Sequence, residues 1–233
     1  LAHERGFLIN LVSLICTADG ETSPMDGVSQ MAAATIDAAY SQFADDRNAK
    51  KYVLAESFEI DAAIRTSGIA CDSETTWWEV TDGLFEAGKL HEASLAQRFA
   101  VPTLADLILV SNDPTVTESF KEMRTKTSER LLTAYQRMVT SATKDFPILS
   151  KPTRFDLSNA RVIAFDLADV TSTAGPQAKR QTAIMYMMAR QAVTVDFWLD
   201  VDELRGLNAP EAYREHHIRR CENNRQMPKR LCF

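Results

Sequence analysis

The sequence predicts a mainly α-helical chain, in which a helical domain (residues 1–150) precedes part of an α/β domain (residues 151–233). Apolar residues recur at helical spacing through about the first 145 residues. After FPILSKP (146–152) the pattern changes to short, continuous apolar runs, which are typical of buried parallel strands. Helical patterns separate these runs, as in the crossover unit of a parallel sheet.

Two helical patterns open the predicted helical domain. The first, GFLINLVSLIC (6–16), is apolar but too short to span a bilayer. In the second, residues 23–43, we expect Ser23 as the N-cap, Pro24 at the first helical position and Asp26 closing a capping box. Its apolar residues recur at helical spacing and predict a face turned to the core: Val28, Met31, Ala32, Ile36, Ala39, Tyr40 and Phe43.

The stretch from Cys71 to Pro102 predicts short helices that break near Gly83 and Gly88. It contains the pair Trp77-Trp78. Because large aromatic side chains dominate burial, we expect the two indoles to wedge between helices. The alternative is an exposed pair that binds a partner, since tryptophan is frequent in interaction hot spots.

Two further helices complete the predicted domain. TLADLILVSND (103–113) predicts a short apolar helix that ends before Pro114. Residues 115–143 predict one long amphipathic helix packed as in a bundle. Its apolar face would comprise Val116, Phe120, Met123, Leu131, Tyr135 and Met138.

The second part of the chain predicts a strand, helices and a final strand. In NARVIAFDLADV (159–170) the apolar run 162–165 predicts a buried strand closed by Asp166. Gly175-Pro176 begins a helix that is apolar almost all round at 183–199, and Asn208 caps another that runs to about Gln226. The chain then stops at an apolar triplet, 231–233, which reads as the opening of a buried strand.

The apolar ending and the absence of an initiating Met predict that these residues are the interior of a longer protein. Composition excludes some functions for them. The chain has only eight glycines in 233 residues and contains no G-x-x-x-x-G-K-[ST], so it carries no phosphate-binding loop. Its net charge of −6 disfavours a dedicated nucleic-acid binder.

The cysteines and histidines predict neither disulfides nor a metal site. The four cysteines are widely scattered, which fits reduced thiols of a cytoplasmic protein better than a disulfide framework or zinc ribbon. His217 and Cys221 are four residues apart, a spacing that suits two ligands of one metal. No second group supplies the remaining ligands, so we expect no metal.

Two candidate sites remain in the second part. Asp166 follows the predicted strand, outside whose carboxyl end α/β proteins place functional groups, so it is a candidate for a nucleotide pocket. Alternatively, Asp166 only caps a turn. Arg180 and Arg190 on the next helix could pair with it, and Arg180 is the second pocket candidate. The helix within 209–230 has a local charge of +3 and suits an acidic neighbour, a nucleotide phosphate or nucleic acid, unless it is simply a solvated face. Its interaction candidates are Arg214, Arg219, Arg220 and Arg225.

Long blocks of the sequence resemble the motor ATPases of conjugation and type IV secretion, in particular the type IVB branch (the IcmB/DotO/TraU-like proteins). The blocks are ERGFLINLVSLICTADGE and DGVSQMAAATIDAAY near the start, and RVIAFDLADV, QAKRQTAIMYMMARQAVTVDFW and NAPEAYREHHIRRCENNRQMPKRLCF in the last eighty or so residues. The middle, about 45–115, adds little to the resemblance.

The resemblance implies a RecA-like P-loop ATPase with a helical insertion between its nucleotide-binding motifs. Residues 151–233 would then end at the strand that carries the Walker B carboxylates, and neither motif lies in this chain. ATP and magnesium would belong to the longer protein, and this segment, without a cofactor, would be inactive. The family implies a cytoplasmic location at the inner membrane through partners, contacts with other secretion subunits, a hexamer and no membrane span. The alternative function is a non-enzymatic helical adaptor.

Overall fold

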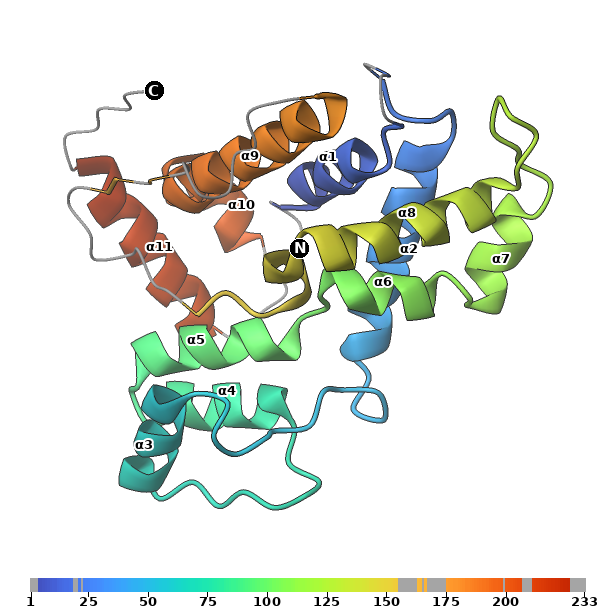
Figure 1. Ribbon diagram of the computed structural model, residues 1–233. Coiled ribbons are helices and arrows are strands. Elements are labelled where there is room, and N and C mark those ends of the chain that lie inside the picture. The colour runs from blue at the N-terminus through green and yellow to red at the C-terminus, as the bar shows by residue number, and fades with distance from the viewer. Residues whose placement is uncertain are drawn as a thin grey trace. The chain divides into compact units, whose positions relative to one another are not determined.

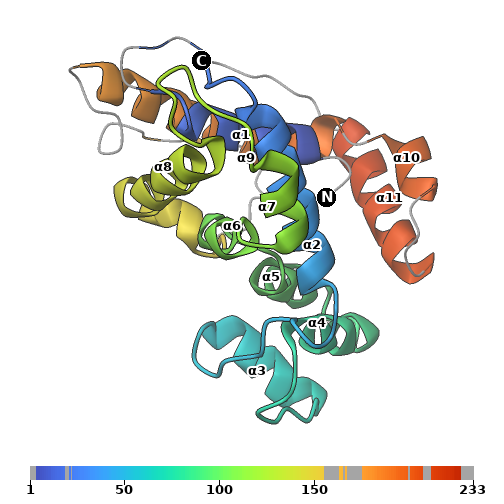
Figure 2. The same cartoon turned by 90° about the vertical axis from the view of Figure 1, so that its right-hand side faces the viewer.

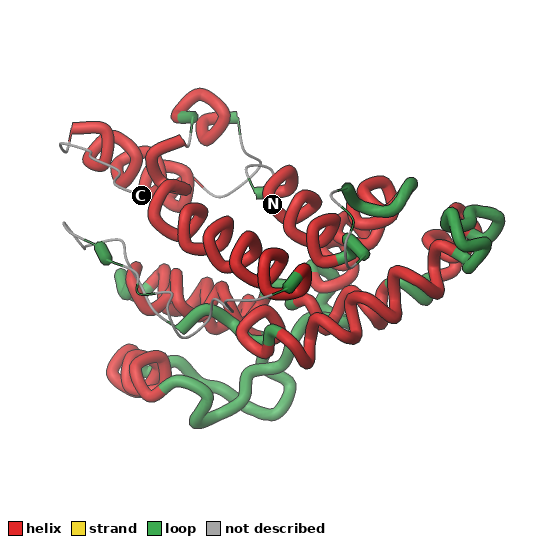
Figure 3. The backbone as a smooth tube through the Cα atoms, turned by 45° about the horizontal axis from the view of Figure 1, so that its top comes forward, coloured by secondary structure: helices red, strands yellow, loops and turns green. Residues whose placement is uncertain are grey.

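The computed structural model describes most of the chain. The chain divides into two compact units, Leu1–Asp156 (unit 1) and Leu157–Phe233 (unit 2). Over the described ranges the chain is mainly helical and contains no strand, as Figures 1 and 3 show. The prediction of a mainly α-helical chain is therefore confirmed for this part. The described residues are 4–18, 21, 23–154, 163–164, 166, 175–198, 200–206 and 211–226.

Unit 1 consists of short helices in two groups, and Figures 1 and 2 both show α3 and α4 at the end away from α1. The helices α3, α4 and α5 pack together, whereas α2 packs with α1, α6, α7 and α8. The described elements of unit 1 are α1 (Arg5–Ile15), α2 (Val28–Phe43), α3 (Phe58–Ser67), α4 (Trp77–Glu86), α5 (Leu90–Ala100), α6 (Leu104–Val110), α7 (Pro114–Phe120), α8 (Leu131–Asp145) and the 3₁₀ helix η1 (Pro147–Ser150).

The helix α2 lies at the centre of its group and contacts α1, α6, α7 and α8. Its buried residues include Val28, Met31 and Ile36, so the predicted core face is confirmed there. A buried hydrogen bond joins α2 to α8: Thr35 Oγ1 and Tyr135 Oη are 2.7 Å apart. Burial raises the pKa of Tyr135, which keeps this phenol neutral.

The predicted start of α2 is wrong. The helix begins at Val28 and not near Ser23, because Gly27 has a φ of +81° and the Val28 N–H donates to the Met25 carbonyl in a preceding turn. Asp-Gly is a strong turn signal, and here it outweighs the capping pattern of Ser23 and Asp26.

The predicted long helix 115–143 is also wrong, because residues 121–130 separate α7 from α8. In this loop the Leu131 N–H donates to the Met123 carbonyl at 2.9 Å, and Ser128 has a φ of +66°. Threonine and serine side chains favour such local turns over helix. Of the predicted apolar face, Val116, Phe120, Leu131 and Tyr135 are nevertheless buried. Met138 is only partly buried, and Met123, which lies in the loop, is 37% exposed, so its predicted burial is wrong.

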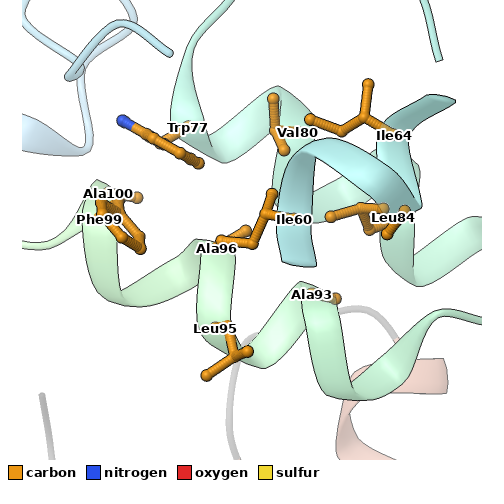
Figure 4. Close-up of a cluster of buried hydrophobic side chains, with 11 residues drawn as sticks. Ile60, Ile64, Trp77, Val80, Leu84, Ala93, Leu95, Ala96, Phe99 and Ala100 are labelled. Atoms are coloured by element: carbon orange, nitrogen blue, oxygen red, sulfur yellow. The ribbon is translucent and has the colours of Figure 1, made fainter. Parts of the chain in front are cut away.

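The group α3–α5 has its own hydrophobic core, and Figure 4 shows side chains of all three helices converging on it. The predicted helix break at Gly83 is wrong, since α4 runs through that residue. A Cβ at Gly83 would lie 3.3 Å from Ile69 Cδ1, so the glycine permits close packing rather than ending the helix. Gly88, with a φ of +74°, does separate α4 from α5 as predicted.

Unit 2 contains three described helices, α9 (Pro176–Trp198), α10 (Val201–Arg205) and α11 (Glu211–Gln226). The start of α9 after Gly175 and the end of α11 at Gln226 agree with the sequence prediction, whereas α10 was not predicted. A small apolar cluster packs α10 against α11 through Val201, Leu204, Ile218 and Cys221.

The two predicted strands cannot be compared with the structure. The final triplet (231–233) lies outside the described residues. So do Val162 and Phe165, the two ends of the other predicted strand. Ile163 and Ala164 are described and belong to no helix or strand.

One stretch, Leu90–Val110, has the length and the mean hydropathy (1.3) of a membrane-crossing helix. It consists of α5 and α6 with a break at 101–103, and 44% of its most apolar window is buried in the fold. The core helices of globular domains give the same signal, so the stretch is weak evidence for a membrane span.

We predict that Tyr135→Phe lowers the free energy of unfolding by about 1 kcal/mol, the usual net value of one buried hydrogen bond. Thr35 Oγ1 keeps an acceptor in this variant, because it also lies 2.9 Å from the Met31 carbonyl. The measurement is urea denaturation followed by circular dichroism. Tyr40→Phe, on the partly buried side of α2, is the control and should change stability less. Equal stability of Tyr135→Phe and the wild type would contradict the assigned bond.

Candidate interaction site

The described residues of unit 1 expose three large apolar side chains on one short segment, residues 52–58, which we call the apolar loop. The exposed fractions are 53% for Val53, 72% for Leu54 and 82% for Phe58. Single exposed apolar residues are common on protein surfaces, but adjacent ones mark contact sites more often. The arrangement of the loop therefore decides whether it is a site.

Both ends of the apolar loop are fixed by backbone bonds. Before the loop, the Tyr52 N–H donates to the Thr75 carbonyl at 2.8 Å, and the Trp77 N–H donates to the Lys50 carbonyl at 2.9 Å. After the loop, Ser57 is the N-cap of α3, and its Oγ accepts from the Ile60 N–H at 3.5 Å. The loop thus runs between a short antiparallel pairing and the start of a helix.

The middle of the apolar loop is held by Asp61, which is only 8% exposed. One carboxylate oxygen accepts from the Tyr52 hydroxyl at 2.6 Å, and the other accepts from the Ala55 N–H at 3.0 Å. Ala55 has a φ of +70°, a conformation that L-residues adopt only at a cost. The bond to Asp61 offsets that cost and fixes the direction in which Val53 and Leu54 point.

The carboxylate of Asp61 is stabilised by more than these two donors. Asp61 lies in the first turn of α3, where the helix dipole favours a negative charge. Arg65 follows one turn later. Burial and the bond to Asp61 raise the pKa of Tyr52, so this phenol stays a donor across the physiological range.

A side chain from the end of unit 1 also reaches the loop. Arg154 Nη2 lies 2.8 Å from Glu56 Oε2, across 98 residues of sequence. The ion pair is exposed, so its contribution to stability is small. It nevertheless places a cation and a carboxylate beside the exposed side chains.

The pair Trp77-Trp78 lies next to the apolar loop, since Trp77 contacts Tyr52, the first residue of the loop. Trp77 is 3% exposed; its ring stacks on Phe99 at 4.5 Å and meets the Tyr52 ring edge-on at 5.0 Å. Trp78 is partly buried, and its Nε1–H donates to the Phe43 carbonyl at 2.9 Å. The expected wedge between helices is confirmed. A partner-binding role for the pair stays a prediction, and in this fold Trp77 offers almost no surface for it.

A half-buried ion pair ties the segment before the loop to α6. Lys50 Nζ lies 2.6 Å from Asp106 Oδ2 and donates to the Val101 carbonyl at 3.0 Å. Asp106 also closes the capping box of α6 with Thr103. The two helix groups of unit 1 are therefore joined next to the apolar loop by Lys50 and, through Phe43, by Trp78.

The nucleotide-pocket candidates lie in unit 2. Asp166 is exposed and lies outside the described helices, and Arg180 lies near the start of α9 and is partly buried. Most of the residues around Asp166 lie outside the described part of the chain, so a nucleotide pocket there stays a prediction.

The basic candidates lie along α11 as predicted. Arg219 and Arg225 are exposed, whereas Arg214 and Arg220 are partly buried. Burial lowers the pKa of His216, and the charges of Arg220 and Arg219 lower it further. Arg219 Nη2 lies 3.9 Å from Glu215 one turn earlier, so part of the basic charge is balanced within the helix.

Cys221 is buried between α10 and α11, so its thiol packs with apolar side chains. Among the described residues, no three His, Cys, Asp or Glu side chains come together as metal ligands would. Burial and neighbouring carboxylates raise the pKa of Cys71, which makes that thiol a poor nucleophile.

The chain matches no protein-family model, no curated protein and no solved structure in comparisons with known proteins.

No sequence pattern pointed to the apolar loop. The signal available was Ser57 as an N-cap, which places Phe58 at the first helical position. That signal does not reveal the contacts of Asp61 and Arg154, which fix the loop.

We predict that Asp61→Ala lowers the free energy of unfolding by about 2 kcal/mol, because two donors lose a buried acceptor. Amide exchange at Ala55 should also accelerate, since its N–H loses its only described acceptor. Glu59→Ala, an exposed carboxylate in the same helical turn, is the matched control and should change stability by less than about 0.5 kcal/mol. Slow exchange at Ala55 in Asp61→Ala would show that Asp61 does not hold the loop.

A second prediction concerns the capping box that begins α4. Glu79 Oε2 accepts from the Thr76 N–H at 2.6 Å, and bonds to Thr76 lower the pKa of Glu79. A lowered pKa gives stability that is present above the unfolded-state value of 4.5 and is lost as the pH falls through the folded-state value.

The stability difference between wild type and Glu79→Gln should therefore shrink as the pH falls from about 6 to about 3. The measurement is urea denaturation at several pH values. Glu86→Gln, at the other end of α4, is the control for the loss of a carboxylate outside the capping box. A pH-independent difference for Glu79→Gln would contradict the capping role of the charge.

Proposed function

We propose that this chain is a non-catalytic segment of a motor ATPase of type IV secretion or conjugative transfer, and that unit 1 docks the motor to another protein. The motor assignment is supported by the sequence blocks at both ends of the chain. The docking role is supported by one observation above all, the apolar loop whose exposed side chains Asp61 holds in place.

A docking role fits the physical character of unit 1. The exposed apolar side chains are attached to an ordered backbone, and an ordered site loses less entropy on binding than a flexible one. The phosphate-binding loop that an ATPase needs is missing from the sequence. Unit 1 would then correspond to the helical insertion of the motor, and unit 2 to the adjoining part of a RecA-like domain.

The remaining parts of the proposal follow from the resemblance or from the sequence patterns described above. The longer protein would bind ATP and magnesium, assemble as a hexamer and lie in the cytoplasm at the inner membrane. Asp166 and Arg180 would lie near its nucleotide, and other secretion subunits would be its partners. Arg214, Arg219, Arg220 and Arg225 would meet an acidic neighbour in the assembly.

The alternative function is a helical adaptor that belongs to no ATPase. The same apolar loop favours it, since docking requires no motor. The two functions predict different sequences on either side of this segment in its gene. A motor requires G-x-x-x-x-G-K-[ST] upstream and an acidic pair directly after Phe233, and a stop codon after Phe233 would exclude the motor.

We predict that the 233-residue chain hydrolyses no ATP in the presence of magnesium, because it lacks the residues that bind phosphate and metal. The measurement is phosphate release from purified protein at increasing ATP concentration. Asp166→Ala and Arg180→Ala are compared with the wild type. Turnover that either variant abolishes would reveal a complete catalytic site in the chain and contradict the proposal.

A further inference from the structure

We infer that the apolar loop binds a protein segment that presents apolar side chains together with lysine or arginine. The inference rests on the proposed docking role and adds the chemistry of the partner. Three features of unit 1 carry it: the charge around the loop, the carboxylates beside Phe58 and the rigidity of the loop.

The stretch of sequence that contains the apolar loop is acidic. Residues 50–89 contain eight carboxylates against four basic residues (Lys50, Lys51, Arg65 and Lys89), which gives a net charge of −4. The rest of the chain then carries −2, since the whole carries −6. Seven of the eight carboxylates are exposed, and only Asp61 is buried. A surface of this charge attracts a cationic partner and repels nucleic acid and anionic membranes.

Carboxylates lie directly beside the exposed apolar side chains. Glu56 and Glu59 flank Phe58 in sequence, and both are exposed. Arg154 Nη2 lies 2.8 Å from Glu56 Oε2, and His91 Nε2 lies 3.0 Å from Glu59 Oε1. Exposed pairs of this kind are weak, so the cations of a partner can replace them at little cost. An apolar centre with a charged rim is also the usual anatomy of a protein interface.

The rigidity of the loop favours a protein partner over a lipid surface. Asp61 fixes the positions of Val53 and Leu54, and Ser57 fixes that of Phe58 at the start of α3. Fixed side chains suit a complementary protein surface, where geometry contributes to affinity. An amphipathic basic helix is a common form for such a partner, because it binds through apolar residues on one face.

The test uses the full 233-residue chain and two fluorescein-labelled peptides of 18 residues. The first is an amphipathic helix of leucine and lysine, and the second has glutamate in place of every lysine. Binding is measured by fluorescence anisotropy at about 0.15 M salt, where long-range attraction is largely screened. We expect the lysine peptide to bind at least tenfold more tightly than the glutamate peptide.

Two double variants separate the apolar and charged parts of the surface. Leu54→Ser with Phe58→Ser should weaken binding of the lysine peptide by about tenfold or more, since central apolar anchors dominate affinity. Glu56→Gln with Glu59→Gln should weaken it by about threefold and reduce its salt dependence. The control is Leu109→Ser, because Leu109 is 72% exposed, as Leu54 is, but lies on α6. It should leave the affinity within about twofold.

The outcomes distinguish the inference from the docking role on which it rests. If both peptides bind equally and both depend on Leu54 and Phe58, docking stands and the cationic partner is wrong. The inference is overturned if the double variant Leu54→Ser with Phe58→Ser binds the lysine peptide as tightly as Leu109→Ser does. It is also overturned if neither peptide binds. In both cases the loop loses its support as a docking site. Loop-dependent binding to vesicles of phosphatidylcholine and phosphatidylglycerol, without peptide binding, would assign the loop to membranes instead.

Discussion

The buried carboxylate of Asp61 is the constraint on which the proposed site depends. A charged group that is 8% exposed must be compensated, and here the Tyr52 hydroxyl, the Ala55 N–H and the first turn of α3 compensate it. These same contacts hold Ala55 at a positive φ and turn Val53 and Leu54 outward. The hydrogen bonds that Asp61 needs when it is buried thus leave the side chains of Val53 and Leu54 exposed.

The apolar loop is continuous with the core of α3–α5. Tyr52 binds Asp61 through its hydroxyl and packs its ring on Trp77, which stacks in turn on Phe99 of α5. The loop is therefore attached to a packed core. Trp78 and Lys50 connect this core to α2 and α6. The contacts of Tyr52, Trp77, Trp78 and Lys50 therefore connect the loop to the rest of unit 1.

Sequence periodicity predicted the helices well where burial decides them, as the buried residues of α2 and α8 show. It failed where local turn chemistry decides. Asp26-Gly27 begins α2 later than its capping pattern indicates, and the polar stretch 121–130 divides a long amphipathic pattern into two helices. Gly83 shows the reverse error, since it serves packing against Ile69 within a continuous helix. The apolar loop was not predictable, because it depends on Asp61 and on Arg154, which lies 98 residues from its partner Glu56.

The central claim is that the apolar loop is both exposed and rigid in solution, and backbone ¹⁵N relaxation tests it most directly. If the contacts of Asp61 hold the loop as described, the amides of residues 53–58 should have order parameters of about 0.85, equal to those of α3. Order parameters below about 0.6 in the loop, with α3 itself rigid, would contradict the claim. The exposed side chains would then belong to a flexible segment and would not form a prepared binding surface.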